Sequence, residues 1–287
     1  MSEDLDKRVN AFRADLADSR LEGRVEATRF VEGRPARVTA ATAPLRRAPR
    51  SDAPVDTEAL RGEDVLVFES TDEGWVWAQL LADGYVGWLA EGALGEPEAA
   101  PTHRVCAPRT LVFPGPDIKR PPLDALPMGA LVTVTGQAED HNARYGLIRP
   151  FGAVVGQHLR TPGEVEADFV AVAERFLGVP YLWGGKTVLG IDCSGLVQVA
   201  CQMAGIWAPR DTDMQERELG TRLAGIEALQ RGDLVFWKGH VGIMIDGERV
   251  VHANAHHMMT AIEPLAEMVA RLEAKGVFVT SVRRLRA

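Results

Sequence analysis

The first half of the chain alternates short apolar runs with turn residues. Beyond about residue 36, runs rich in Val, Leu and Trp lie at 37–40, 64–68, 75–80 and 85–89. An Asp-Glu-Gly and an Asp-Gly sequence separate the last three runs. Several short strands at close spacing predict a small β-barrel. The first 33 residues are charged, with weak helical periodicity, and we expect them to pack onto a larger body.

A looser version of the same pattern follows. Its apolar runs lie at 109–113, 130–134 and 145–148, and residues 156–159 resemble an end piece. A Thr-Pro-Gly sequence at 161–163 then marks a junction. The pattern therefore predicts a second small β unit, more divergent than the first.

From residue 164 the pattern becomes that of an α+β domain. Apolar residues at spacings of three and four predict a helix over 164–177, ended by a Gly-Val-Pro sequence. A second apolar run predicts a helix from Cys193 to about Met203. Strands are expected at 234–237, 240–245, 249–254 and 277–282, with a short helix over 264–272. We divide the chain into parts with the bounds 1–33, 34–98, 99–163 and 164–287.

Composition and charge narrow the class of partner. The 287 residues carry a net charge of −8, with 46% hydrophobic and 25% charged residues and no extended basic run. Nucleic acid and anionic membranes are therefore poor candidates as partners. The N-terminus lacks the apolar stretch of a signal peptide, and no run of about 20 apolar residues could span a bilayer. We expect a cytoplasmic protein; the sequence does not indicate its oligomeric state.

The three cysteines do not form a disulfide framework. Cys193 and Cys201 are separated by about 12 Å along one predicted helix, too far to bridge. Cys106 and Cys201 fit the role of small buried apolar residues. A reducing compartment, in which a free thiol survives, suits this pattern.

Cys193 stands apart from the other two cysteines. It follows a Gly-rich turn and Asp192, and it opens a predicted helix. Free backbone N–H groups and the macrodipole favour negative charge at that place. We therefore expect the pKa of this thiol to be lowered from about 8.5 to roughly 3.5–7.5, which makes it a nucleophile. His240 and His252 follow on strand-like segments, which is the order of a papain-type catalytic triad.

The turn between the two histidines decides whether they share a face of the sheet. A two-residue Asp246-Gly247 loop would place them on opposite faces. A three-residue loop from Ile245 to Gly247, with Gly247 in the left-handed conformation, would place His240 directly opposite His252. Catalysis requires the shared face, so we predict the three-residue loop.

A zinc site built from Cys193, His240 and His252 is the competing interpretation. The tight ligand spacing typical of zinc sites is missing from this sequence. We therefore expect no metal and no other cofactor. His256 and His257 add little, since adjacent histidines in a polar stretch are usually solvated.

Taken together, these motifs resemble the NlpC-type family of bacterial cell-wall cysteine peptidases. The resemblance covers about residues 165–287 and includes an Asp-Cys-Ser-Gly, a Gly-His-Val-Gly and a Val-His-Ala motif in order. The two upstream β units are similar to bacterial SH3-like domains that often precede such peptidases. The implied fold is multidomain: two small SH3-like β-barrels followed by an α+β papain-like cysteine peptidase domain.

The resemblance also implies roles for individual residues. Cys193 would be the nucleophile, His240 the general base and then acid, and His252 the residue that orients His240. Backbone N–H groups at the helix start, including that of Cys193, would hold the oxyanion, with Ser194 and Tyr181 assisting.

Within the family, the chain looks most like γ-D-glutamyl-L-diamino acid endopeptidases, which recycle peptidoglycan peptides. The segment 180–185, with Tyr181 and Trp183, resembles their substrate-lining segment. In the segment 210–215, Asp211 would anchor the ammonium group of an N-terminal L-alanine, and Thr212 replaces the family's usual serine.

In those enzymes the first SH3-like domain contributes a Tyr and a Glu to the site. Tyr85 is the candidate for the first role, and Glu58 or Glu63 for the second. Simpler structural roles compete with these assignments. Asp211 could cap a helix, and Trp183 or Tyr85 could serve packing alone.

The expected function is that of a cysteine endopeptidase that cuts the γ-D-glutamyl–diamino acid bond of free peptidoglycan peptides. One alternative is a hydrolase acting on intact peptidoglycan stems, and another is an acyl-transferring or amidase member of the same fold. A wall-binding protein with an inert peptidase domain is a third, which the intact triad disfavours.

Overall fold

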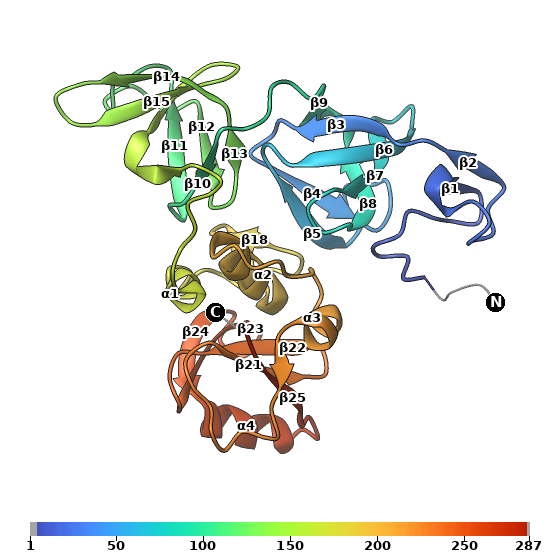
Figure 1. Cartoon of the computed structure of the whole chain (residues 1–287), viewed down its shortest axis with the longest axis vertical. Coiled ribbons are helices and arrows are strands. Elements are labelled where there is room, and N and C mark those ends of the chain that lie inside the picture. The colour runs from blue at the N-terminus through green and yellow to red at the C-terminus, as the bar shows by residue number, and fades with distance from the viewer. Residues whose placement is uncertain (1–4, 286–287) are drawn as a thin grey trace. The chain divides into compact units, whose positions relative to one another are not determined.

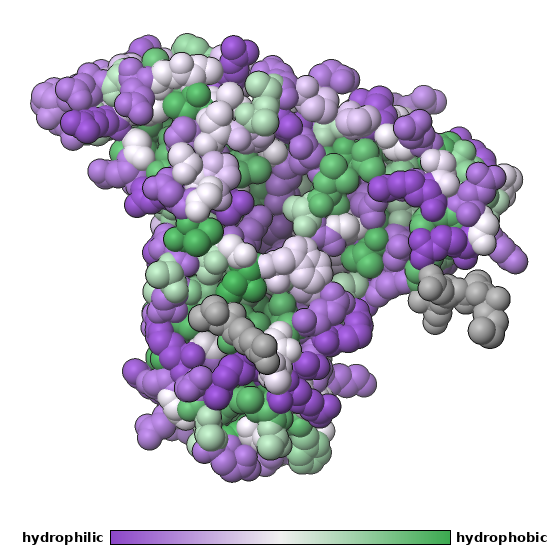
Figure 2. All heavy atoms as spheres, in the orientation of Figure 1, coloured by the Kyte–Doolittle hydropathy of each residue, from purple (hydrophilic) through white to green (hydrophobic). Residues whose placement is uncertain are grey.

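The computed structural model describes residues 5–285. The chain divides into two compact units, Met1–Gly163 and Glu164–Ala287 (Figure 1). Within residues 5–285, no helix is both long enough and apolar enough to cross a membrane. On the face drawn in Figure 2, apolar residues occur in several separate groups with hydrophilic residues between them.

The first part of the N-terminal unit is an antiparallel sheet with the strand order β5-β4-β8-β7-β6-β3-β9. Inward-facing residues of its alternating runs, such as Val65, Val76 and Leu89, are fully buried in one apolar core. The strands are β3 (Arg34–Val38), β4 (Thr42–Arg46), β5 (Val55–Leu60), β6 (Asp64–Ser70), β7 (Trp75–Leu80), β8 (Val86–Ala90) and β9 (Leu94–Gly95), with the 3-10 helix η2 (Glu91–Ala93) before β9.

The residues before this sheet are extended rather than helical, contrary to their weak helical periodicity. The strands β1 (Leu16–Asp18) and β2 (Arg29–Val31) pair in parallel, with the 3-10 helix η1 (Ser19–Leu21) between them. Leu16 packs with Phe68 and Trp77 of the sheet. Burial of these side chains against an existing sheet outweighs a weak local preference.

Residues 103–160 form two further sheets over a separate apolar core. The strand orders are β13-β10-β17 and β12-β11-β16-β15-β14, and Val105, Leu126 and Val154 are fully buried. The elements are β10 (His103–Val105), β11 (Arg109–Phe113), β12 (Asp124–Pro127), β13 (Leu131–Val132), β14 (Val134–Glu139), β15 (Arg144–Ile148), β16 (Ala153–Val155), η3 (Gly156–His158) and β17 (Leu159–Arg160).

The C-terminal unit is built on a sheet with the strand order β20-β25-β21-β22-β23-β24. In the view of Figure 1 the strands β21 to β25 lie between helices α2 and α4. Its strands are β18 (Lys186–Thr187), β19 (Gly190–Ile191), β20 (Thr221–Arg222), β21 (Asp233–Trp237), β22 (His240–Met244), β23 (Arg249–Asn254), β24 (Met259–Pro264) and β25 (Val279–Arg284). Its helices are α1 (Phe169–Glu174), α2 (Cys193–Met203), α3 (Thr212–Glu218) and α4 (Leu265–Glu273).

Helix α1 is much shorter than the predicted helix over 164–177. Asp168 caps it by accepting a hydrogen bond from the backbone N–H of Val170. Before that cap, the backbone N–H of Glu166 donates to the carbonyl of Met203 at the end of α2. The chain thus satisfies its backbone groups against a neighbouring helix, and the apolar periodicity alone does not set the helix start.

Helix α2 packs against strands β22 and β23. Leu265 and Met268 of α4 join Val250 and Met244 in an apolar cluster on the same sheet. Strand β24 was missed by the sequence analysis, although it pairs with β23 along its whole length. The helices and this strand bring together the side chains described next.

Candidate active site

Cys193 is the first residue of α2, as predicted. The carboxylate of Asp192 caps the helix by accepting from the backbone N–H of Gly195 at 2.7 Å, and it also accepts from that of Gly184 at 2.8 Å. A Cβ at position 195 would lie 2.4 Å from the carbonyl oxygen of Gly185, so only glycine fits there. The Gly-rich turn and the cap together place Cys193 at the start of the helix.

A buried arginine holds this turn from the other side. Arg210 is 1% exposed and donates to both carboxylate oxygens of Asp192, at 2.9 and 2.7 Å. It also donates to the hydroxyl of Ser194 at 2.8 Å. Gln215 donates to the backbone carbonyls of Ser194 and Pro209 at 2.9 and 2.8 Å. The segment after Pro209 is thereby fastened to the turn that carries Cys193.

The loop between β22 and β23 differs from the predicted one. Four residues, Ile245 to Glu248, lie between the two strands, and Asp246 accepts from the backbone N–H groups of Glu248 and Arg249. Gly247 does not adopt a positive φ. Because Ile243 pairs with Val251, the register is shifted by two from the one expected.

His240 and His252 therefore lie diagonally on one face of the sheet, not directly opposite each other. Nε2 of His240 lies 2.8 Å from Nδ1 of His252. By the same register, the residue opposite His252 is Gly242, where a Cβ would lie 2.5 Å from a methyl group of Val250. The missing side chain leaves room for the diagonal contact, which is within reach of long side chains.

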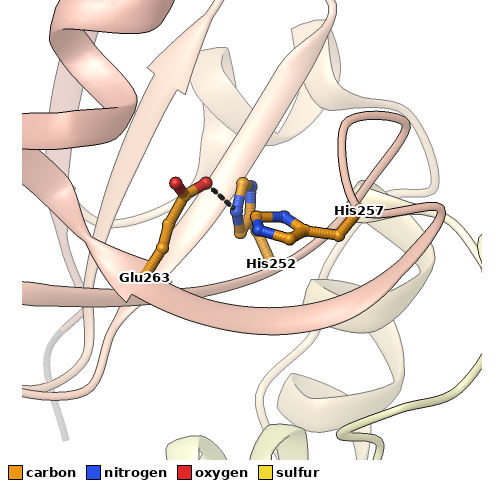
Figure 3. Close-up of side chains that lie close together, drawn as sticks. All are labelled: His252, His257 and Glu263. Carbon is orange, nitrogen blue, oxygen red and sulfur yellow. Dashed lines mark hydrogen bonds and ion pairs between the residues drawn. The ribbon is translucent and has the colours of Figure 1, made fainter.

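Two residues that the sequence analysis missed continue this chain of contacts. Oε1 of Glu263 lies 2.9 Å from Nε2 of His252, the interaction drawn as a dashed line in Figure 3. Arg271 of α4 donates to both oxygens of Glu263, at 2.7 and 2.5 Å. The sequence signal that could have found Glu263 was the short segment 260–263, which reads Thr-Ala-Ile-Glu. This segment is compatible with a strand but too short to predict one.

His257 lies beside His252 and Glu263 in Figure 3. One ligand atom from each of these three residues lies within 4.8 Å of the other two, a spacing that a metal ion could use. However, Arg271 donates to both oxygens of Glu263, and the ring of His257 is 3.0 Å from Oδ1 of Asn254. The positive guanidinium of Arg271, bonded to Glu263, would repel a metal cation at the same carboxylate. The three side chains therefore suit a chain of hydrogen bonds better than a metal site.

Burial controls the protonation of Cys193, His240 and His252. It raises the pKa of the Cys193 thiol to about 11, and the carboxylate of Asp192 acts in the same direction. Hydrogen bonds from the backbone of Val241 and from Thr212, together with the charge of Arg210, oppose that rise. The expectation of a lowered pKa is thus wrong for the substrate-free protein, because desolvation of the thiolate exceeds the stabilisation at the helix start.

The histidines are shifted in the other direction. Burial, together with the neighbouring His252, lowers the pKa of His240 to about 3. Burial likewise lowers the pKa of His252 to about 4, while Glu263 opposes that shift. At neutral pH the site therefore holds a thiol and two neutral imidazoles. A neutral imidazole can accept a proton from Cys193. The Sγ of Cys193 accepts a hydrogen bond from the backbone of Val241, the residue after His240.

Of the other predicted residues of the C-terminal unit, Thr212 and Tyr181 lie close enough to Cys193 to interact with it. The hydroxyl of Thr212 lies 3.8 Å from Sγ of Cys193. Tyr181 is half-buried, and burial followed by the charge of Cys193 raises its pKa. Trp183 is 63% exposed. Asp211 occupies the N-cap position of α3, yet its side chain makes no capping hydrogen bond.

Ser194 and the two residues of the N-terminal unit are placed differently. The hydroxyl of Ser194 is buried between Arg210 and Asp192. Tyr85 is 4% exposed and belongs to the apolar core of the first sheet. Glu58 is buried on β5. Their roles toward a substrate stay predictions.

Comparison with known proteins gives matches over both units. Residues 178–274 match the profile of the NlpC/P60 family, and residues 45–94 match that of the bacterial dipeptidyl-peptidase Sh3 domain. The second of these matches lies within the first part of the N-terminal unit, and a second barrel at 103–160 stays a prediction.

Two curated relatives are similar over most of the chain. A gamma-D-glutamyl-L-lysine dipeptidyl-peptidase of Bacillus cereus is 27% identical over 240 residues, which cover 74% of this chain and 71% of that protein. A protein of the same description from Bacillus subtilis is 25% identical over 249 residues, which cover 79% of this chain and 81% of that protein.

A solved structure shares the fold. The crystal structure of an NlpC/P60 family protein from Bacillus cereus superposes with a TM-score of 0.73 at 23% identity. The superposition covers 88% of this chain and 99% of that protein.

Proposed function

We propose that this chain, which carries an NlpC/P60 peptidase domain preceded by a bacterial SH3 domain, hydrolyses the γ-D-glutamyl–diamino acid bond of peptidoglycan peptides. The observation that carries the proposal is the placement of Cys193 at a helix start beside the strand that begins with His240. His252 is within hydrogen-bond distance of His240, which completes a Cys-His-His triad. The names of the two Bacillus relatives agree with this bond specificity.

In the proposed reaction His240 removes the proton from Sγ of Cys193 as sulfur attacks the carbonyl carbon of the γ-glutamyl amide. The resulting oxyanion accepts hydrogen bonds from backbone N–H groups at the start of α2, where the loss of one donor costs about 3–4 kcal/mol. The imidazolium of His240 then protonates the departing amine of the diamino acid. Water, deprotonated by His240, hydrolyses the thioester and restores the thiol.

The neutral resting state fits this sequence of steps. Because the thiol and the imidazole are both uncharged before substrate binds, the proton moves only as the carbon–sulfur bond forms. The substrate replaces water around the thiol, and the developing charges then lie between His240 and the helix start.

We propose that Asp211 selects peptides with a free N-terminal L-alanine. Its carboxylate is half-buried and makes no capping hydrogen bond to α3, so helix capping does not account for it. Arg210 and Gln215 fasten the same segment to the turn before Cys193, so Asp211 has a defined distance from the nucleophile. Tyr181, Trp183 and Thr212 would line the path between the ammonium group and the cleaved bond, and Ser194 would support the turn.

We also propose, from the resemblance alone, that Tyr85 and Glu58 contribute to substrate binding. The proposed domain limits are 34–98 for the first SH3-like domain, 99–163 for a second and 164–287 for the peptidase. The proposed enzyme needs no cofactor.

Mass spectrometry of the products tests the proposed function. Purified L-Ala-γ-D-Glu-diaminopimelate peptides should release the dipeptide L-Ala-γ-D-Glu, and Cys193→Ala should not release it. Retention of more than a few per cent of activity in Cys193→Ala would remove the nucleophile assignment.

The same assay with N-acetylated and muramic-acid-linked peptides tests the substrate selection. Loss of a charge-assisted contact costs about 1.5–3 kcal/mol. Asp211→Asn should therefore reduce kcat/KM strongly for the free peptide and barely for the acetylated one. If glycan-linked peptides are cut as fast as free ones, a hydrolase of intact peptidoglycan stems replaces the proposal.

A further inference from the structure

We propose that Glu263 and Arg271 are positioning residues that determine which ring nitrogen of His240 carries the proton. The inference rests on the proposed function in one respect, namely that His240 is the base of the reaction. Neither residue belongs to the triad, and they come from β24 and α4, elements that carry no member of it.

The geometry begins at the ion pair. The side chain of Glu263 is 8% exposed, and Arg271 approaches both of its oxygens, at 2.7 and 2.5 Å. This paired arrangement keeps the carboxylate charged and fixes its orientation. Arg271 lowers the pKa of Glu263 accordingly, against the effect of burial.

The charged carboxylate determines the tautomer of its neighbour. An ionised carboxylate has no proton to donate, so at 2.9 Å Nε2 of His252 must be the donor to Glu263. A neutral imidazole carries one N–H, which leaves Nδ1 of His252 as an acceptor. That atom lies 2.8 Å from Nε2 of His240, which must then carry its proton.

The remaining nitrogen of His240, Nδ1, is therefore unprotonated and basic. In this state His240 can accept a proton from Cys193 without first exchanging one with water. The reversed chain, with both protons on Nδ1, would place a donor where the base is needed. The Glu263–Arg271 ion pair thus influences the proton transfer from Cys193 through the imidazole rings of His252 and His240.

The charges of Glu263 and Arg271 also affect the pKa values of His252 and His240. Besides each other, the two histidines interact with the titratable or charged groups of Glu263, Arg271 and, for His252, His257. Glu263 favours protonation of both rings, whereas Arg271 disfavours it. Burial keeps His240 neutral at rest, the charges of Glu263 and Arg271 act on it in opposite directions, and the carboxylate still defines its tautomer.

Nitrogen-15 NMR of histidine-labelled full-length protein tests the tautomers directly. In the wild type and in Cys193→Ala, both His240 and His252 should carry the proton on Nε2. In Glu263→Ala, Arg271 loses its acceptor and donates to Nε2 of His252, so both rings should change to the Nδ1–H form. With the base blocked, kcat/KM should fall by at least about 100-fold, as in other triads with a misplaced tautomer. A folded Glu263→Ala protein in which His240 keeps the Nε2–H form would overturn the proposal.

Arg271→Met gives an independent readout if Glu263→Ala does not fold. Without the cation, the charge of Glu263 is uncompensated, and the acid limb of the kcat/KM profile should move to higher pH by about one unit. Arg271→Lys should keep the wild-type limb. Arg249→Met, which breaks an exposed ion pair on the strand that carries His252, is the matched control and should leave the limb in place.

An unmoved limb in Arg271→Met would show that the ion pair only supports the fold. Failure of the proposed function looks different. If Cys193→Ala remained active, the reaction assignment would fall, while the tautomers measured without substrate would still report on Glu263.

Discussion

Replacement of Arg210 by methionine should weaken the C-terminal unit selectively. The side chain of Arg210 is 1% exposed and makes hydrogen bonds to Asp192 and Ser194. Methionine fills much of the volume but leaves the carboxylate of Asp192 buried without its counter-charge. Breaking a buried pair in this way costs about 3–5 kcal/mol.

The magnitude follows from what Asp192 retains. It still accepts from the backbone N–H groups of Gly184 and Gly195, so the helix cap, worth about 1 kcal/mol, is preserved. The lost contribution is therefore the charge pairing and not the cap. With a slope of about 1.5–2 kcal/mol per molar urea for a unit of this size, the unfolding midpoint should fall by about 1.5–3 M.

The two other buried cysteines permit an assay that separates the units. Cys201 is fully buried in α2, and Cys106 is buried in the N-terminal unit. A pulse of thiol reagent at each urea concentration, followed by peptide mass spectrometry, reports the opening of each unit independently. In Arg210→Met the midpoint for Cys201 should fall and that for Cys106 should not.

Arg231→Met is the matched control for this experiment. Arg231 pairs with Asp168 and Glu174 in the same unit, but its side chain is 39% exposed. Loss of such exposed pairs costs about 0–1 kcal/mol. If Arg210→Met lowered the Cys201 midpoint no more than Arg231→Met does, the argument that the buried pair holds the turn would be refuted.

Three further predictions concern the triad. His252→Gln should preserve part of the rate, because its amide can keep one hydrogen bond to His240, whereas His252→Ala should lose nearly all of it in a peptide-hydrolysis assay. Alkylation of Cys193 by iodoacetamide should accelerate continuously between about pH 6 and pH 9, because the thiol pKa is raised to about 11; a plateau already reached by neutral pH would contradict this. The lowered pKa values of His240 and His252, about 3 and about 4, mean that the unfolded chain binds more protons below about pH 6.5. The free energy of unfolding of the C-terminal unit should therefore fall from about pH 6.5 toward pH 4, measured by hydrogen exchange; a constant value over that range would contradict the buried neutral histidines.

Some features follow from local sequence because their causes are local. Helix α2 begins at Cys193 because Asp192 can cap it and an apolar run follows, both visible in a few residues. Strand β23 has the predicted bounds for a similar reason, since its apolar residues lie between polar turn residues. The three motifs likewise predicted a resemblance to the NlpC-type family, and residues 178–274 match the profile of the NlpC/P60 family.

Other features depend on segments that meet only in the folded chain. The loop after β22 is set by the side chain of Asp246, which shifts the register and makes the contact between His240 and His252 diagonal. Glu263 reaches His252 because β24 pairs with β23, and Arg271 joins them because α4 packs onto the same sheet. The spacing of these residues along the chain does not predict that their side chains make contact.

The protonation of the nucleophile shows the physical reason most directly. The position of Cys193 at a helix start is a local property, and it favours a thiolate. The desolvation that reverses this preference comes from the packing of α2 against β22 and β23, and the negative charge of Asp192 acts in the same direction. The sequence by itself therefore predicted which groups react, whereas the tertiary structure decided their charge, because solvent exclusion is a property of everything packed around a group.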